Sequence, residues 1–510
     1  MVVRCRLCSS AICLRITHVN TQTPTIDSSE KLVPAAAEVT PPPPVTPQVS
    51  TKTTTQTTSH SKLYLAAWRW HFYAGLYVIP FLLILAMTGM AMLWTSTLFG
   101  RDGERMTVVM QGEPMAVSQQ AAAAQSAVPE GELVQYIAPL SPDLAAIFSM
   151  KTADETLSIA VNPYTAQVLD QTSRENSWYN LFDNIHGSLL LGTTGDRLIE
   201  IAASLSMVLI ATGLYLWWPK KTGLLAALIP NVRARGRALW KSLHVSVGVW
   251  ISLLLFVFLL TGLSWAGVWG EKLVQAWNTL PAEKYGAPQS EDIHASMNHD
   301  GTKQVPWALE QTPMPASGSD AGSVVMTAAM PVDIDSVATL ARGLGFEQRF
   351  QLNLPQGETG VWTISRDSMS SDSTEATTDR TVHVDQFSGK VLADIGFQDY
   401  SIYGQAMAAG VGFHMGTLGL WNVALNTVFC LSVIFLCISG AIMWWKRRPV
   451  NAGRLVAPPM PANMPHWRGA ALTGLAISLF FPMAGIALLV VMFVDFLIVS
   501  RVPMLKRALS

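Results

Sequence analysis

The stretch "WRWHFYAGLYVIPFLLILAMTG", residues 68–89, decides the fold class of this chain. Its apolar run is long enough to cross the roughly 30 Å hydrocarbon core of a bilayer as a helix. The run nevertheless holds a histidine, His71, about one turn inside it. A second stretch, "LWKSLHVSVGVWISLLLFVFLLTG" at residues 239–262, repeats the arrangement around His244. Because polar rings are costly inside lipid, two of them at matching positions indicate a function.

The two stretches share more than a histidine. Each histidine is followed by a glycine four residues later and by a Thr-Gly pair 17 and 18 residues later. The two sets are His71, Gly75, Thr88 and Gly89, and His244, Gly248, Thr261 and Gly262. Identical offsets in two apolar segments indicate an internal duplication.

A different pattern also occurs twice. A histidine precedes a Thr-Gly or Ser-Gly pair, which is followed by two tryptophans and then by basic residues; the two sets are His186 with Thr212-Gly213, and His414 with Ser439-Gly440. The segments "LSIAVNPYTAQVLD" (157–170) and "TVHVDQFSGKVLAD" (381–394) both read as strand, tight turn and strand. The repeated unit is therefore span, outer domain with a β-hairpin, and span.

Composition supports a membrane protein with sizeable water-exposed parts. The chain has 510 residues, of which 50% are hydrophobic and only 14% are charged. Its formal net charge of −1 gives no indication of a nucleic-acid partner.

We expect an α-helical integral membrane protein with about five hydrophobic segments, four of them core spans in a duplicated helix-domain-helix unit, and two small α+β periplasmic domains. The predicted parts are a disordered Thr- and Pro-rich cytoplasmic tail (1–61), span 1 (62–98), periplasmic domain 1 (99–196), span 2 (197–218), a basic loop (219–241), span 3 (242–269), periplasmic domain 2 (270–411), span 4 (412–445), a basic loop (446–468), a fifth segment that is a kinked span or a helical hairpin (469–500), and a tail (501–510).

Charge sets the expected orientation. The loops 219–241 and 446–468 hold several lysines and arginines and no acidic residue, so the positive-inside rule places both in the cytoplasm. The N-terminus is then cytoplasmic and the two acid-rich segments lie outside. A single fifth crossing would leave Arg501 and its basic neighbours outside as well, which fits the rule poorly.

The topology sorts the four repeated histidines into two depths. His71 and His244 lie near the inner face, whereas His186 and His414 lie near the outer face. Imidazole is a strong axial ligand for haem iron, so two layers of paired histidines predict two haems and an electron path across the bilayer. Gly75 and Gly248 lie one turn after the inner histidines, where they remove side chains and make room for a haem.

A further set of candidate metal ligands lies in "EDIHASMNHD", residues 291–300. His294, Met297 and His299 offer nitrogen and sulfur ligands that bind copper or iron transiently. A solvated loop is the alternative reading of this segment. His383, on a predicted hairpin strand, reads as an ordinary strand residue.

The repeated motifs resemble the PepSY-associated transmembrane family, also called iron-regulated membrane proteins, over about residues 62–500. Some relatives in that family are ferric-siderophore reductases of the bacterial inner membrane that contain b-type haems. The resemblance implies two haems b held by His71, His186, His244 and His414. It also implies that the two outer segments are PepSY-like, although Ala166 replaces the turn glycine that stands at Gly389 in the second hairpin.

The resulting hypothesis is an inner-membrane di-haem oxidoreductase, a ferric-chelate reductase that supports iron uptake. Electrons from a quinol or a cytoplasmic reductase would reduce a periplasmic ferric siderophore or another Fe(III) chelate. No dinucleotide-binding glycine fingerprint appears in a strand-to-helix context, so a separate electron donor is expected. The alternatives are a haem-free metal-uptake accessory or permease, and a membrane protein that regulates a peptidase through its PepSY hairpins.

Overall fold

The structure is a computed structural model, and it describes residues 62–101, 103–219, 223–275, 286–298, 305–326, 331–449, 454–459, 467–494, 497–498 and 501–504. The predicted tail, residues 1–61, and the candidate ligand His299 lie outside the described residues.

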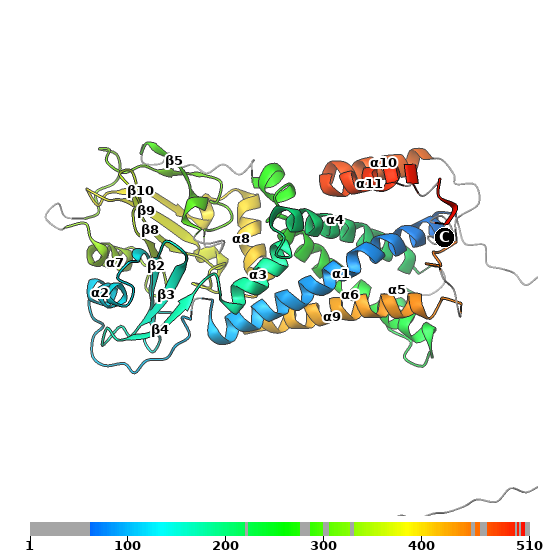
Figure 1. Ribbon diagram of the computed structural model, residues 1–510, viewed down its shortest axis with the longest axis horizontal. Helices are drawn as coiled ribbons and strands as arrows, with labels where there is room; N and C mark the ends of the chain where they lie inside the picture. The colour runs from blue at the N-terminus through cyan, green and yellow to red at the C-terminus, as the bar shows by residue number, and fades with distance from the viewer. Residues whose placement is uncertain are drawn as a thin grey trace, which may run out of the picture. The chain divides into compact units, whose positions relative to one another are not determined.

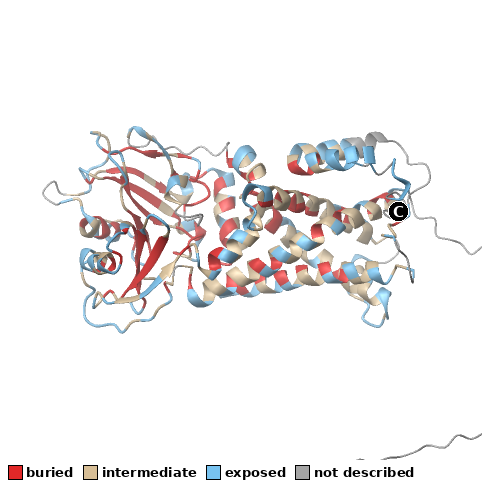
Figure 2. Ribbon diagram, viewed as in Figure 1, coloured by how far each residue is buried: buried red, intermediate tan, exposed pale blue. Residues whose placement is uncertain are grey.

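Four long apolar helices have the length and hydropathy that a bilayer crossing requires (Figure 1). They are α1 (Lys62–Phe99), α4 (Gly192–Trp217), α6 (Arg237–Leu263) and α9 (Leu420–Trp445). Helix α1 packs against α4 and α9, and α6 packs against the same two helices, so α1 and α6 face each other diagonally across a four-helix bundle. Large apolar side chains on these helices are exposed, as a lipid-facing surface requires (Figure 2). The chain is therefore a multi-pass membrane protein.

The helix ends differ from the predicted spans at one functional position. The predicted fourth span, 412–445, is two helices, α8 (Ile402–Met415) and α9, so His414 is not part of a membrane span. Gly416 and Gly419 between them adopt positive φ angles of 83° and 98°, which end a helix readily at glycine. Similarly, His186 lies on the short helix α3 (Trp178–Ser188), and the next span begins at Gly192 instead of residue 197.

Two buried asparagines of α9 complete the break after α8. The Nδ2 of Asn422 donates to the Phe413 carbonyl at 3.0 Å, and the Nδ2 of Asn426 donates to the carbonyls of Phe413 and His414 at 2.8 and 3.1 Å. Carbonyls at a helix C-terminus lack partners within the helix, and in an apolar setting they need substitutes. These amides therefore fix the last turn of the helix that carries His414.

The segments between the spans build one antiparallel sheet in the order β10-β9-β8-β7-β1-β2-β3-β4 (Figure 1). Its strands are β1 (Glu132–Ile137), β2 (Ala146–Lys151), β3 (Thr156–Val161), β4 (Val168–Ser173), β7 (Gln351–Asn353), β8 (Val361–Arg366), β9 (Arg380–Asp385) and β10 (Val391–Gly396). The first segment supplies β1–β4 and the second supplies β7–β10. The strands are mostly buried (Figure 2).

The prediction of two small separate domains is therefore wrong. Strands β1 and β7 pair antiparallel, with Tyr136 opposite Leu352, and this pairing joins the two copies into one sheet. The helices α2 (Val117–Ala127) and α7 (Ile334–Gly343) pack against each other, and both contribute to the core over this sheet. A four-stranded copy alone would expose an unpaired edge at β1 or β7, and the pairing removes both edges.

The remaining described elements are shorter. They are α5 (Leu224–Leu228), a π-helix (Trp269–Val274), β5 (Gln289–Ile293), a 3-10 helix (His294–Met297), β6 (Pro313–Pro315), two further 3-10 helices (Ala376–Thr378 and Phe397–Asp399), α10 (Trp467–Phe480) and α11 (Pro482–Val494). Strands β5 and β6 form a separate two-stranded sheet.

The fifth hydrophobic segment is two short helices, α10 and α11, that pack against each other, and α11 also packs against α4. A Cβ added at Gly485 would lie 2.7 Å from the Ser478 side chain, so the helices approach closely there. Each is about 20 Å long, too short to cross the hydrocarbon core upright. Of the two forms left open by the sequence, this is the helical hairpin.

The hairpins β3–β4 and β9–β10 have matching turns. The N–H of Ala166 donates to the Asn162 carbonyl at 2.9 Å, and the N–H of Gly389 donates to the Asp385 carbonyl at 3.1 Å. Ala166 adopts a φ of 52° and Gly389 a φ of 66°. The alanine thus occupies the left-handed conformation that glycine provides without strain in the second copy.

Exchanging these turn residues should change stability in opposite directions. We expect Ala166→Gly to stabilise the chain by roughly 0.5–1 kcal/mol, because relief of left-handed strain exceeds the added chain entropy. Gly389→Ala should destabilise it by more than about 1 kcal/mol, since the new Cβ would also lie 2.7 Å from the Met326 sulfur. Thermal unfolding of the detergent-purified protein measures both changes. An Ala166→Gly variant less stable than the wild type would contradict the strain argument.

Candidate functional site

All four repeated histidines are held by the same kind of contact. The Nδ1 atom of each lies within hydrogen-bonding distance of a threonine or serine hydroxyl on another helix. The pairs are His71–Thr212 at 3.0 Å, His186–Thr88 at 3.0 Å, His244–Ser439 at 2.8 Å and His414–Thr261 at 2.8 Å. The hydroxyls belong to the Thr-Gly and Ser-Gly pairs of the sequence repeat. Each pair therefore anchors a histidine of a neighbouring helix instead of its own.

Neighbouring groups assign the proton on each Nδ1. The Thr212 hydroxyl lies 2.6 Å from the Val208 carbonyl of its own helix, to which it donates its single proton, and the other three hydroxyls have similar bonds. The oxygen then accepts from the imidazole. Nδ1 therefore carries the proton, and the Nε2 lone pair is available to a metal.

The glycine of each pair provides space for the anchored ring. A Cβ added at Gly213 would lie 3.2 Å from His71 Cε1, and one added at Gly89 would lie 3.2 Å from His186 Cε1. The corresponding distances are 3.5 Å for Gly262 and His414 and 3.7 Å for Gly440 and His244. The hydroxyl and the glycine thus act together, one as the hydrogen-bond acceptor and the other by allowing the ring to approach the helix.

Gly75 and Gly248 have a different environment from the one predicted for them. An added Cβ at Gly75 would meet Leu209 of α4 at 3.9 Å, and one at Gly248 would meet Leu436 of α9 at 3.8 Å. Both are ordinary van der Waals distances to a neighbouring helix. That these glycines make room for a haem stays a prediction, because the structure places them against leucines and not against the rings.

His186 and His414, which we call the sheet-side pair, lie close together. Their ring centres are 6.4 Å apart and the ring planes are inclined by 89°. A metal–imidazole bond is about 2 Å long, so two imidazoles on opposite sides of one metal have ring centres about 6 Å apart. The sheet-side pair therefore fits two axial ligands of one metal. The ring of Phe258 lies 4.7 Å from that of His414 and 4.1 Å from that of Phe429, and provides an apolar wall.

His71 and His244, which we call the loop-side pair, lie on the diagonal helices α1 and α6. They are close enough to interact electrostatically. Their anchors, Thr212 and Ser439, lie on α4 and α9, the two helices that separate α1 from α6. The two ligands thus project into the bundle from opposite helices, and the flanking helices orient them. This is how helical bundles build cofactor sites.

The ligand type and the surroundings of both pairs fit a haem better than a bare metal ion. Each pair supplies only two protein ligands, and among the described residues no group of three or more His, Cys, Asp or Glu side chains could hold a metal. A macrocycle that supplies its own four nitrogens needs only the two axial positions. The apolar helices around both pairs suit such a group.

A buried acidic cluster was missed by sequence reasoning. Asp367, Asp372 and Asp379 come from "RDSMSSDSTEATTD" (366–379), which has the composition of a solvated loop. The structure buries all three, and Arg349 donates to Asp372 at 2.7 Å. Burial and the carboxylates of Asp372 and Asp379 raise the pKa of Asp367 well above its usual value, and burial raises the pKa of Asp379 to about 7.

This acidic cluster touches the helix that carries His414. A cavity of about 10 Å³ lies between Asp367 and Asp379 on one side and Ala408 and Val411 of α8 on the other. The cluster therefore supports α8 from the sheet side. No feature of the local sequence marks this contact, because it depends on a fold-back of the loop between β8 and β9.

The acidic cluster predicts a pH-dependent stability. The Asp379 carboxyl is protonated in the folded chain up to pH about 7, whereas its usual pKa is 3.8, so its contribution to stability is lost as pH rises from about 4 to 7. Asp379→Asn removes this loss. We expect the stability of Asp379→Asn relative to the wild type to be higher at pH 8 than at pH 5. Melting curves at both pH values measure this, with Glu358→Gln, at an exposed position, as the control. An equal difference at both pH values would contradict the prediction.

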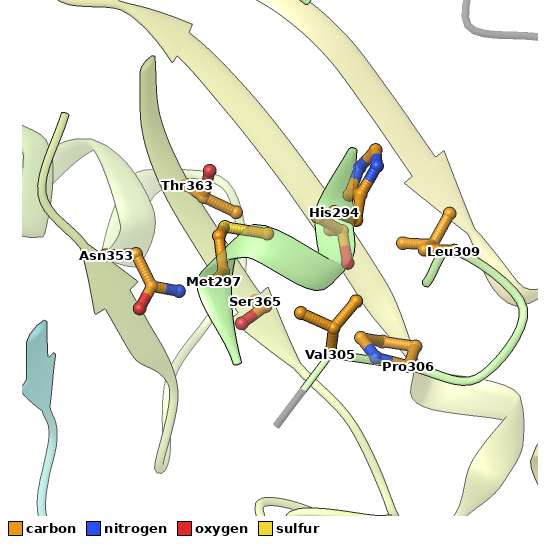
Figure 3. Close-up of a pocket in the computed structure, with 9 residues that line it drawn as sticks. His294, Met297, Val305, Pro306, Leu309, Asn353, Thr363 and Ser365 are labelled. Carbon is orange, nitrogen blue, oxygen red and sulfur yellow. The ribbon is translucent and has the colours of Figure 1, made fainter. Parts of the chain in front are cut away.

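The other described candidate ligands, His294 and Met297, lie between α6 and α8, in the part of the chain that also supplies strands β7–β10. His294 and Met297 begin and end one 3-10 helix and line the same small cavity (Figure 3). His294 contacts His383 of β9, with 2.9 Å between the two Nε2 atoms. His383, which the sequence presents as an ordinary strand residue, is therefore part of a buried histidine pair. The signal for it is the alternation of polar Thr381, His383 and Asp385 on a strand that is buried on both faces.

Comparison with known proteins identifies the family. A search of curated proteins found no match. The family described as the PepSY-associated TM region matches residues 68–447, which include most of α1, all of α4, α6 and α9, and the four anchored histidines. The match covers most of the chain and contains both copies of the repeat. The chain belongs to the PepSY-associated TM region family.

Proposed function

We propose that this chain is a di-haem b-type membrane oxidoreductase that passes electrons across the bacterial inner membrane and reduces a periplasmic Fe(III) chelate, such as a ferric siderophore. The observation that carries the proposal is the set of four histidines, each anchored through Nδ1 with Nε2 free, in two pairs. His71 and His244 would hold one haem, and His186 and His414 the other.

The two pairs have a separation that suits transfer across a bilayer. Helix α1 carries His71 and also Thr88, which anchors His186. These two positions are 17 residues apart, or about 25 Å along the helix, which is most of the hydrocarbon thickness. The basic loops 219–241 and 446–468 support a cytoplasmic loop-side pair, so the sheet would face the periplasm.

The residues of the chain have defined tasks in this proposal. Haem, when bound, supplies one-electron transfer. The Thr and Ser hydroxyls orient the imidazoles and keep the proton on Nδ1, and the apolar bundle excludes water from the ligands. One electron converts Fe(III) to Fe(II), which hard oxygen donors of a chelate bind more weakly. The electron donor would be a quinol or a cytoplasmic reductase, because the chain shows no nucleotide-binding fingerprint.

Vesicle reconstitution tests this function. The full chain, purified with haem and inserted into lipid vesicles with dithionite trapped inside, should reduce an external ferric trihydroxamate chelate, detected by an external Fe(II) indicator. The double variant His71→Ala/His414→Ala should be slower by at least about tenfold, since each pair would lose a ligand. Equal rates for wild type, the double variant and empty vesicles would refute the proposal. A chain that folds and inserts but contains no haem would favour the metal-uptake accessory instead.

A further inference from the structure

A third pair of histidines, His294 and His383, lies at the eight-stranded sheet, away from the helical bundle. His294 is 1% exposed and His383 is fully buried, and their Nε2 atoms are 2.9 Å apart. His383 is part of a polar row that crosses the sheet, with Thr363 opposite it and Asn353 opposite Thr363. Burying two imidazoles costs hydration, so their position at this contact requires a reason beyond core packing.

Both rings are anchored at Nδ1, as in the bundle. His294 Nδ1 lies 2.8 Å from the Thr312 carbonyl, and His383 Nδ1 lies 2.9 Å from the Thr363 hydroxyl. The carbonyl only accepts, so the His294 proton is on Nδ1 and its Nε2 is a lone pair. Burial lowers the pKa of His294 to about 4 and, with the neighbouring His294, lowers that of His383 well below its usual value. The pair is therefore neutral, with one proton between the two Nε2 atoms.

A thioether side chain, that of Met297, lines the same small cavity as His294. Met297 is three residues after His294 on the 3-10 helix, where side chains three apart overlie each other. Both residues line one cavity of about 10 Å³, which has room for a single small species (Figure 3). Asn353 Oδ1 and Thr381 Oγ1, from residues that line this cavity and are at most 8% exposed, have no hydrogen-bond partner among the described residues. Unsatisfied buried oxygens indicate that the cavity holds a further species.

The chemical types of the side chains at this cavity indicate which ion it would bind. Among the described residues that line the cavity there is no carboxylate and no thiol. The desolvation cost of an ion rises with the square of its charge, so a neutral buried site favours a monovalent cation. Imidazole and thioether ligands are those that Cu(I) prefers, whereas alkali ions and Mg²⁺ prefer oxygen.

We propose that His294, His383 and Met297 form a buried Cu(I) site. Binding requires no net proton release. The His383 proton moves from Nε2 to Nδ1, from which it donates a hydrogen bond to the Thr363 oxygen while the Thr363 O–H turns away, and copper takes the place of the proton between the two Nε2 atoms. With metal–nitrogen bonds of about 2 Å, a three-coordinate site needs the Nε2 atoms about 3.5 Å apart, so the rings separate by about half an ångström. The site does not depend on the haems.

Competition with bicinchoninate tests the site on the full chain. The three tail cysteines, Cys5, Cys8 and Cys13, are replaced by serine in every sample, because thiolates bind Cu(I) strongly. We expect one tightly held Cu(I) per chain in this background. Met297→Leu conserves volume and should weaken binding by at least about tenfold. His383→Gln should remove it.

Met369→Leu is the matched control, because Met369 is also buried and lines the other small cavity. It should leave Cu(I) binding unchanged. A single size-exclusion peak and cooperative thermal unfolding in every variant report an intact fold, whether or not haem is bound, and the X-ray absorption fine structure of the copper should show two nitrogens and one sulfur in the wild type. The proposal fails if no Cu(I) binds, if Met297→Leu binds as tightly as Met369→Leu, or if copper lacks the sulfur ligand, in which case the cavity holds only water.

Discussion

Replacing His414 by alanine is expected to remove one haem and leave the other. His414 would hold the sheet-side haem with His186, whose ring centre is 6.4 Å from its own. The loop-side pair lies on α1 and α6, whereas the sheet-side pair lies on α3 and α8, so the loop-side pair keeps both of its ligands. The reduced spectrum should therefore lose about half of its haem absorbance, and the low-spin signal of one bis-imidazole iron should disappear.

Double variants sharpen this test. His186→Ala/His414→Ala should lose no more haem than His414→Ala alone, because both residues serve the same site. His71→Ala/His414→Ala should lose both haems. His383→Gln is the control, since it removes a buried histidine from the sheet and not from the bundle. Equal partial loss of both haems in every single variant would refute the pairing of the ligands.

Replacing Gly213 by leucine should have an effect nearly as large at the other site. A Cβ at this position would lie 3.2 Å from His71 Cε1, so the neighbour would have to give by a few tenths of an ångström even for alanine. A leucine side chain fills the space that the ring occupies. We expect the ring to be displaced and the loop-side haem to be lost, whereas the sheet-side haem remains. Haem content and the low-spin signals measure the outcome.

Gly75→Ala provides the contrast for this prediction. It lies on α1 near the same histidine, but its added Cβ would meet only Leu209 at 3.9 Å. Alanine stabilises a helix interior by about 1 kcal/mol over glycine, so this variant should keep both haems and be slightly more stable. A Gly213→Leu variant with full haem content would show that the Thr-Gly pair does not fix the ring position.

The sequence predicts the membrane part of the fold well, because its information is local. Apolar length and the repeated offsets locate the four spans, although the fourth begins at Leu420 and not at residue 412. The strand-turn-strand hairpins are recognised by alternation, and the structure confirms both. The pairing of β1 with β7 is not predictable in the same way, since these strands are more than 200 residues apart and nothing local distinguishes one eight-stranded sheet from two smaller sheets.

The candidate site, too, is predictable from the sequence only in part. Sequence offsets identify the four histidines and the Thr-Gly and Ser-Gly pairs, but they associate His71 with Thr88 of its own helix. In the structure His71 contacts Thr212, and Thr88 contacts His186. Which helices are neighbours depends on the tertiary structure. Without that knowledge, no role can be assigned to the Thr and Ser hydroxyls. The contact between His383 and His294 is likewise not predictable from the sequence, because His294 belongs to a different part of the chain.

The haem content of the purified full chain tests the central claim most directly. The pyridine haemochrome assay, together with oxidised and dithionite-reduced spectra after haem-replete expression, gives the number and type of haems per chain. Two free Nε2 pairs predict two b-type haems per chain, both low-spin. A folded chain with no Soret band would contradict the account.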